Sequence, residues 1–151
     1  MDRQGRASYR LMREVRYQLT FEGKVSPEDE MGSVMRVETR ASFGAGVDPV
    51  FATGAPQAVV HAMVEPDDFG GFRESGEIIF GGGTLTYVSD GEGKIGESAD
   101  PTLQQGHVVR RIEGGSGAFE GASGVIVSVF TVSEDAQMRD SQSAVIFLTS
   151  N

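Results

Sequence analysis

The chain has 151 residues, a formal net charge of −9 and no cysteine. This length is typical of one domain with its own core, and the lack of cysteine excludes disulfides, thiolate metal sites and a cysteine nucleophile. The acidic balance argues against binding nucleic acid through a basic face. No apolar run approaches the roughly 20 residues of a membrane helix, and the N-terminus lacks the apolar region of a signal peptide. We therefore expect a cytoplasmic protein that binds neither nucleic acid nor membrane.

The first thirteen residues differ from the rest of the chain. They contain four arginines at helical spacing, with little acid among them: Arg3, Arg6, Arg10 and Arg13. On a helix these side chains would share one face, which could sit on an acidic surface or act as a lid, and a frayed tail is the alternative. We therefore predict a flexible basic N-terminal tail or lid at residues 1–13 and a single domain at residues 14–151.

From Glu14 onward the apolar residues recur every second position, which is typical of half-buried strands. In the first strand the inward set is Val15, Tyr17, Leu19 and Phe21, and in the second, residues 33–43, it is Met35, Val37, Thr39 and Ala41. Further strands bounded by Gly, Pro or Asp are predicted at residues 57–64, 71–80, 83–89, 107–113, 124–133 and 142–149. Residues 44–56 and 90–106 are predicted loops. About eight strands without a helix indicate an antiparallel barrel or a sandwich.

Two charged residues fall on predicted inner faces. In residues 71–80 the inward set is Phe72, Glu74, Gly76, Ile78 and Phe80, and in residues 107–113 it is Val108, Arg110 and Ile112. A buried carboxylate needs a partner, so Glu74 and Arg110 are predicted to pair across the lumen as a polar anchor or a general acid/base. The alternative is that one or both face solvent, because a register error of one residue inverts each set.

The last two predicted strands are apolar on both faces. Val125, Val127 and Val129 alternate with Ile126 and Phe130, and residues 144–148 contain no polar residue. A strand that is apolar on both sides has its outer face covered, and no predicted helix could cover it. We therefore expect a homo-oligomer that packs through these C-terminal strands.

The residue pattern supports neither a metal site nor a nucleotide site. The two histidines, His61 and His107, are far apart in sequence and give no recognisable ligand spacing. His61 shares a face with Val59 and Met63 and is predicted to be a core residue, whereas His107 is predicted at the surface or rim. Residues 91–96 fit GxGxxG, but no helix is predicted after them, so this segment is interpreted as a mobile hairpin loop. We expect neither a metal nor a cofactor.

A glycine-rich corner gives the main functional clue. The sequence Gly114-Gly115-Ser116-Gly117-Ala118-Phe119-Glu120-Gly121-Ala122-Ser123-Gly124 resembles the corner of the allene oxide cyclase-like barrels, which include dirigent proteins and small bacterial polyketide cyclases. The segment 76–82 is similar to the family's upstream strand. The resemblance implies an eight-stranded antiparallel barrel with an apolar lumen. The plant cyclase reaction is not implied, since its site uses cysteine and asparagine, and the only asparagine here is Asn151.

The bacterial cyclases are nearer in size and character. The resemblance to them implies a cofactor-free cyclase or isomerase of secondary metabolism that folds a linear, polyketide-like substrate for a [4+2] cycloaddition, largely by restricting its conformation. The candidate catalytic residues are Glu74, Arg110 and Tyr87. The candidate substrate-binding residues are Tyr17, Phe21, Met35, Phe72, Phe80 and Phe119, of which Phe119 would close one end of the lumen. Residues 44–54 and 90–106 are candidates for gating the mouth. The alternatives are a lipocalin-like carrier of an apolar small molecule and a solidly packed structural barrel.

Overall fold

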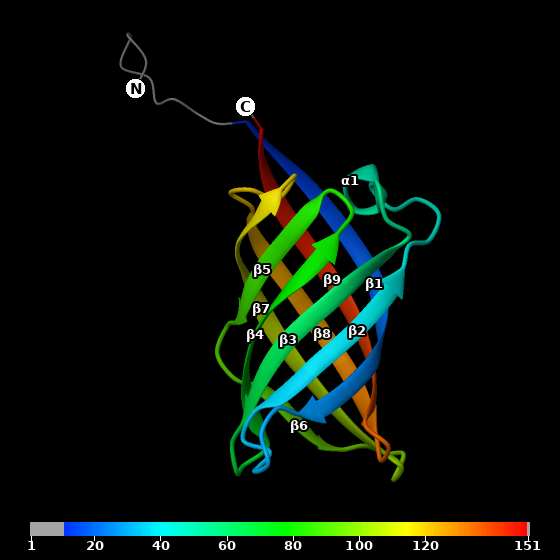
Figure 1. The fold of residues 1–151 in the computed structure, drawn as a ribbon, viewed down its shortest axis with the longest axis vertical. Helices are drawn as coiled ribbons and strands as arrows, with labels where there is room; N and C mark the ends of the chain where they lie inside the picture. Colours follow the sequence, from blue (N-terminus) through cyan, green and yellow to red (C-terminus); the bar gives the residue numbers. More distant parts are fainter. Residues whose placement is uncertain (1–10, 151) are drawn as a thin grey trace.

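The computed structural model describes residues 11–150, which form one continuous antiparallel sheet and a single helical turn (Figure 1). The strands, in chain order, are β1 (Leu11–Pro27), β2 (Met35–Ser42), β3 (Gln57–Pro66), β4 (Gly71–Phe80), β5 (Gly83–Ser89), β6 (Gly93–Glu97), β7 (Leu103–Gly117), β8 (Ser123–Ser133) and β9 (Gln137–Ser150). The helical turn, α1 (Pro49–Ala52), lies between β2 and β3.

The sheet closes on itself into a barrel. Its strand order is β3-β2-β1-β9-β8-β7-β5-β4-β6, with further pairings of β3 with β4 and of β7 with β6. Both β5 and β6 pair antiparallel with β4 on one side and β7 on the other, so they occupy one interrupted strand position. The result is a closed eight-stranded antiparallel barrel, as the sequence predicted.

The alternating inward residues form the core. Along β1 the buried residues are Val15, Tyr17, Leu19 and Phe21, and the predicted inward sets of β4 and β7 are oriented correctly as well. The register is fixed because a shift of one residue would expose every apolar side chain of a strand. The predicted strand phases of β1, β4 and β7 are therefore confirmed, whereas the phase predicted for β3 was wrong, because Ala58, Val60 and Ala62 are its buried residues.

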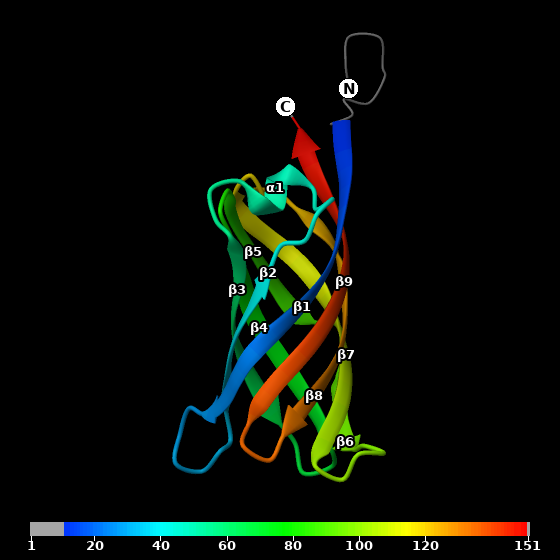
Figure 2. The ribbon, with the colours of Figure 1, turned by 90° about the vertical axis from the view of Figure 1, so that its right-hand side faces the viewer.

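The helical turn α1 lies at one end of the barrel (Figure 2), and aromatic rings fill the interior at that end. Asp48 caps the turn by accepting a hydrogen bond from the Val50 backbone N–H, and Pro49 occupies its first turn. Phe51 is fully buried and lies 5.9 Å from Phe119 and 5.1 Å from Phe80, centroid to centroid. We call Phe51, Phe80 and Phe119 the aromatic plug. The prediction of a plain loop at residues 44–56 was therefore wrong, whereas Phe119 does close one end.

Two segment boundaries also differ from the predictions. Residues 90–106, predicted as a loop, contain β6 and the first part of β7. The GxGxxG segment, interpreted above as a mobile hairpin loop, is therefore strand from Gly93 onward. Gly93 is buried, at a position where a Cβ atom would lie 2.2 Å from the Phe72 ring. The predicted tail at residues 1–13 overlaps β1 from Leu11 onward, and the remainder of that tail lies outside the described residues.

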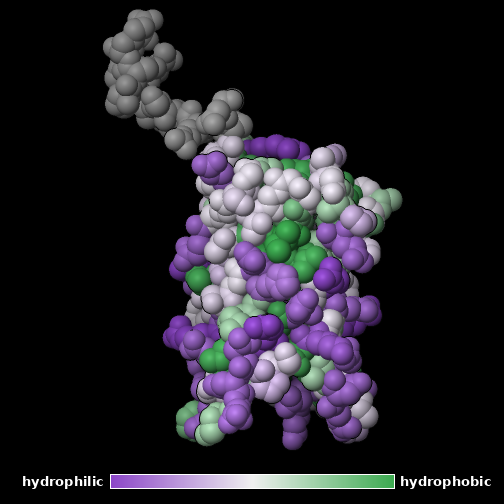
Figure 3. Space-filling view, in the orientation of Figure 1, coloured by the Kyte–Doolittle hydropathy of each residue, from purple (hydrophilic) through white to green (hydrophobic). Residues whose placement is uncertain are grey.

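The outer surface is polar over β2 to β5 and more apolar over β8. Hydrophilic side chains predominate on the face seen in Figure 3. His61 is half-buried on this outer side, aligned with Glu38 and Glu77, so its prediction as a core residue was wrong; His107 is exposed, as predicted. Four exposed valines form a stripe on β7 and β8: Val109, Val125, Val127 and Val129. Between residues 11 and 150, no helix has the length and apolar character needed to cross a membrane.

Candidate functional site

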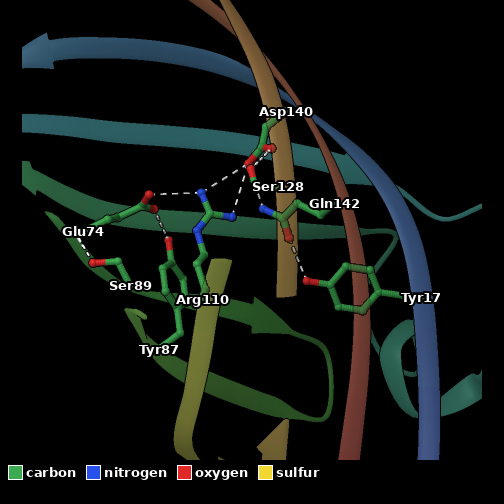
Figure 4. A network of polar contacts seen from close by, with 8 residues as sticks. All are labelled: Tyr17, Glu74, Tyr87, Ser89, Arg110, Ser128, Asp140 and Gln142. Atoms are coloured by element: carbon green, nitrogen blue, oxygen red, sulfur yellow. Dashed lines mark hydrogen bonds and ion pairs between the residues drawn. The ribbon is translucent and has the colours of Figure 1, made fainter. Parts of the chain in front are cut away.

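A buried ion pair bridges β4 and β7, the strands on either side of β5, inside the barrel (Figure 4). Arg110 on β7 donates from Nη2 to Oε1 of Glu74 on β4 at 3.1 Å, and the Tyr87 hydroxyl on β5 donates to Glu74 Oε2 at 2.6 Å. The Arg110 guanidinium also lies 5.0 Å from the centre of the Tyr87 ring, a distance typical of cation–π contact. The three predicted catalytic residues therefore form one cluster, and the predicted pairing of Glu74 with Arg110 is confirmed.

A second acidic residue lies on the other side of the guanidinium. Asp140 on β9 accepts hydrogen bonds from both terminal nitrogens of Arg110 at 3.4 Å, from Gln142 Nε2 at 3.0 Å, and from the Ser128 hydroxyl. Gln142 in turn accepts a hydrogen bond from the Tyr17 hydroxyl at 2.7 Å. All seven residues are buried, and together they span the barrel as a polar layer: Tyr17, Glu74, Tyr87, Arg110, Ser128, Asp140 and Gln142.

Burial and neighbouring charges shift the pKa values of three residues of this layer: Arg110, Tyr17 and Tyr87. Burial works to lower the pKa of Arg110, but the nearby Glu74, Tyr87 and Asp140 raise that pKa above its ordinary value. Burial raises the pKa of Tyr17, and burial together with the Glu74 carboxylate raises the pKa of Tyr87 well above its ordinary value. The guanidinium is therefore permanently charged, and both phenols keep their protons at neutral pH.

A cavity of about 320 Å³ occupies the half of the barrel on the other side of the polar layer from the aromatic plug. Its walls are mainly apolar, and the cavity opens at the barrel end where exposed residues of the β8–β9 connection line it. The lining residues include Val25, Met35, Val37, Val64, Phe72, Glu74, Ile95, Phe130, Val132, Glu134 and Met138. A volume near the lower end of the range for small-molecule sites indicates room for one compact ligand.

Two phenylalanines of the cavity wall rest against glycines. Phe72 and Phe130 contact each other edge to face, with ring centroids 5.9 Å apart. A Cβ atom at Gly93 would lie 2.2 Å from Phe72 Cζ, and one at Gly106 would lie 2.4 Å from Phe130 Cζ. The missing side chains therefore give the tips of both rings room at the barrel wall that a Cβ atom would occupy.

The predicted substrate-binding residues divide between the two ends. Met35 and Phe72 line the cavity, with Glu74 at its buried end. Four others are buried outside its lining: Tyr17, Phe21, Phe80 and Phe119. The lumen is therefore not hollow along its whole length, because the aromatic plug fills the α1 end. Gating by residues 44–54 was also misplaced, since these residues lie at the plugged end rather than at the open one (Figure 2).

Sequence reasoning missed the half of the polar layer that β8 and β9 contribute. The strand was predicted to begin at Gln142, so Asp140 fell outside the predicted strands, but β9 begins at Gln137. The available signal was the alternation of Met138, Asp140, Gln142 and Ala144, all buried, with the exposed Arg139, Ser141 and Ser143. Among the described residues, no group of three or more His, Cys, Asp or Glu side chains is placed to hold a metal ion.

The protein is thus a closed antiparallel barrel with an aromatic plug at one end and a cavity at the other. A solved structure of the pterocarpan synthase dirigent protein GePTS1 is similar, with a TM-score of 0.62 over 95% of this chain and 94% of that chain. The sequence identity is 12%, so the likeness shows a dirigent-type barrel fold. No protein-family model matches the chain, and no curated protein matches it in sequence.

Proposed function

We propose that this barrel is a cofactor-free cyclase or isomerase of secondary metabolism, which binds one mainly apolar molecule in the cavity and promotes its cyclisation. The observation that carries the proposal is the junction of an apolar cavity with a buried polar layer at Glu74. Mainly apolar walls with a small number of well-placed polar groups, here Glu74 at the buried end, are typical of sites that fix a ligand in one orientation. The structural likeness to a barrel named as a pterocarpan synthase dirigent protein supports chemistry on a small molecule.

In the proposed mechanism the walls hold a linear substrate in a folded pose. For a Diels–Alder reaction, three π bonds become one π bond and two carbon–carbon σ bonds, with no proton or electron exchanged with the protein. The rate gain then comes from the conformational freedom that binding removes. Glu74 would anchor the polar end of the substrate, and Tyr87 and Arg110 would keep the Glu74 carboxylate in place through the hydrogen bonds already present.

The test uses linear trienes in which a conjugated diene is tethered to an unsaturated carbonyl and the far end carries a hydroxyl group, which can donate a hydrogen bond to the Glu74 carboxylate. The rate at which diene absorbance is lost with the protein present is compared with the rate in buffer alone. The products are separated by chiral chromatography. A cyclase accelerates the loss and gives one enantiomer in excess. Glu77→Gln, on the outer face of the same strand, is the matched control for Glu74→Gln.

A carrier for the same class of ligand is the second candidate. It is favoured by one observation, which is that both Glu74 oxygens already accept hydrogen bonds inside the protein. A carrier binds the trienes without accelerating their cyclisation. A protein that neither binds nor converts any of them contradicts both candidates.

A further inference from the structure

We infer that the cavity takes an apolar molecule that ends in a protonated amine, with the ammonium group directed to Glu74. This inference rests on the proposed function only in requiring that the cavity binds a small molecule. It follows from three features of the described residues: the charges in the lining, the use of donors in the polar layer, and the balance of formal charge there.

The lining of the cavity carries acids without bases. Glu74 lies at the buried end and Glu134 at the exposed mouth, and among the described residues no lysine, arginine or histidine contributes to the lining. Arg110 is outside the lining and only 1% exposed. A ligand in the cavity therefore meets the carboxylate of the Glu74–Arg110 pair rather than its guanidinium.

Hydrogen bonding in the polar layer leaves acceptors available at the cavity, and the buried Arg110 Nε, a donor without a partner, belongs to a side chain outside the cavity lining. The hydroxyl groups of Tyr17, Tyr87 and Ser128 each donate their single proton to another member of the layer. Each Glu74 oxygen accepts one hydrogen bond within the layer, whereas a carboxylate has about four acceptor positions in total. Glu74 can therefore accept further hydrogen bonds from a ligand that donates them.

Formal charge distinguishes an ammonium group from a neutral donor. The layer holds two acids, Glu74 and Asp140, and one base, Arg110, so at their formal charges one negative charge is unbalanced. A buried charge without a counter-charge is costly, and a cationic ligand group at Glu74 supplies one. The same unbalanced charge, together with Glu134 at the mouth, opposes entry of an anion.

The experiment compares three probes with one eight-carbon skeleton: n-octylamine, 1-octanol and octanoate. Dissociation constants are measured by calorimetry at neutral pH for the unaltered protein, for Glu74→Gln and for Glu77→Gln. Glu77 is exposed on the outer face of β4, so its substitution removes the same charge without touching the cavity. We expect n-octylamine to bind roughly tenfold or more tighter than 1-octanol, with octanoate weakest. Glu74→Gln should remove this preference, and Glu77→Gln should retain it.

The outcomes separate this inference from the proposed function. Equal affinity for the amine and the alcohol, or a preference for octanoate, overturns the inference while ligand binding stands. A preference that survives in Glu74→Gln overturns it too, because the amine would then be held by surface charge. Failure of all three probes to bind contradicts the proposed function instead. Should Glu74→Gln not fold, a crystal structure with n-octylamine decides: the nitrogen beside a Glu74 oxygen supports the inference, and the nitrogen at the mouth overturns it.

Discussion

Replacing Gly93 by alanine should narrow the cavity by pushing one of its wall rings inward. The new Cβ atom would lie 2.2 Å from Phe72 Cζ, and ordinary contact begins at 3.4 Å, so the ring must move by about 1.2 Å (3.4 − 2.2). The backbone at Gly93 does not have a positive φ, so alanine itself is tolerated there. Overpacking of this kind typically lowers the free energy of unfolding by about 1–3 kcal/mol.

The assay pairs a melting curve with binding of a slim and a bulky ligand, 1-octanol and cyclooctanol. We expect Gly93→Ala to weaken cyclooctanol binding far more than 1-octanol binding, because the displaced Phe72 ring occupies part of the cavity's width. Gly96→Ala is the matched control, since it lies on the same strand and a Cβ atom there has no neighbour within 4 Å. Unchanged affinity for both ligands, with a crystal structure showing Phe72 in place, would refute the reasoning.

Three further predictions concern the polar layer and the outer surface. Arg110→Met leaves two buried carboxylates without a cation and should lower the free energy of unfolding by about 3–5 kcal/mol in urea titrations. Arg111→Met, at the exposed neighbouring position, should change this free energy little, and equal effects of the two substitutions would contradict the prediction. Because burial raises the pKa of Tyr17 and Tyr87, their contribution to stability is full below about pH 10, where unfolded tyrosine ionises, and is lost at higher pH. No more than one of the three tyrosines should therefore show phenolate absorbance before the protein unfolds, and two titrating in the folded state would contradict this. We also propose that the valine stripe packs against a second copy of the chain, so Val127→Lys should dissociate the oligomer in sedimentation experiments, and a monomeric unaltered protein would refute it.

Most strands of the barrel could be predicted from the sequence because the period-two alternation of apolar residues indicates which side chains point inward. Glu74 and Arg110 could be paired from the alternation alone, since a carboxylate among Phe72 and Phe80 needs a counter-charge. Asp140 was missed because Arg139, Asp140 and Ser141 are all polar, which obscures the alternation of Met138, Asp140 and Gln142. Its burial depends on the pairing of β9 with β8, which is a long-range property.

The division of the lumen was harder to predict for a similar reason. Phe51 lies in a short segment between glycines, and it closes the barrel through contacts with Phe80 and Phe119, which are distant in sequence. The Asp48–Pro49 pair was a usable sign of a helical turn. Gly93 and Gly106 had the composition of a loop, but each gives room for an aromatic ring, and composition alone does not distinguish these two uses of glycine.

The most direct test of the account is a crystal structure of the protein soaked with 1-octanol, a neutral ligand that leaves the question of the amine aside. We predict electron density for the alkyl chain against Phe72, Phe130 and Met138, with the hydroxyl group toward Glu74. Density found only on the outer valine stripe, or a cavity filled by rearranged side chains, would contradict the claim that this barrel binds its ligand inside.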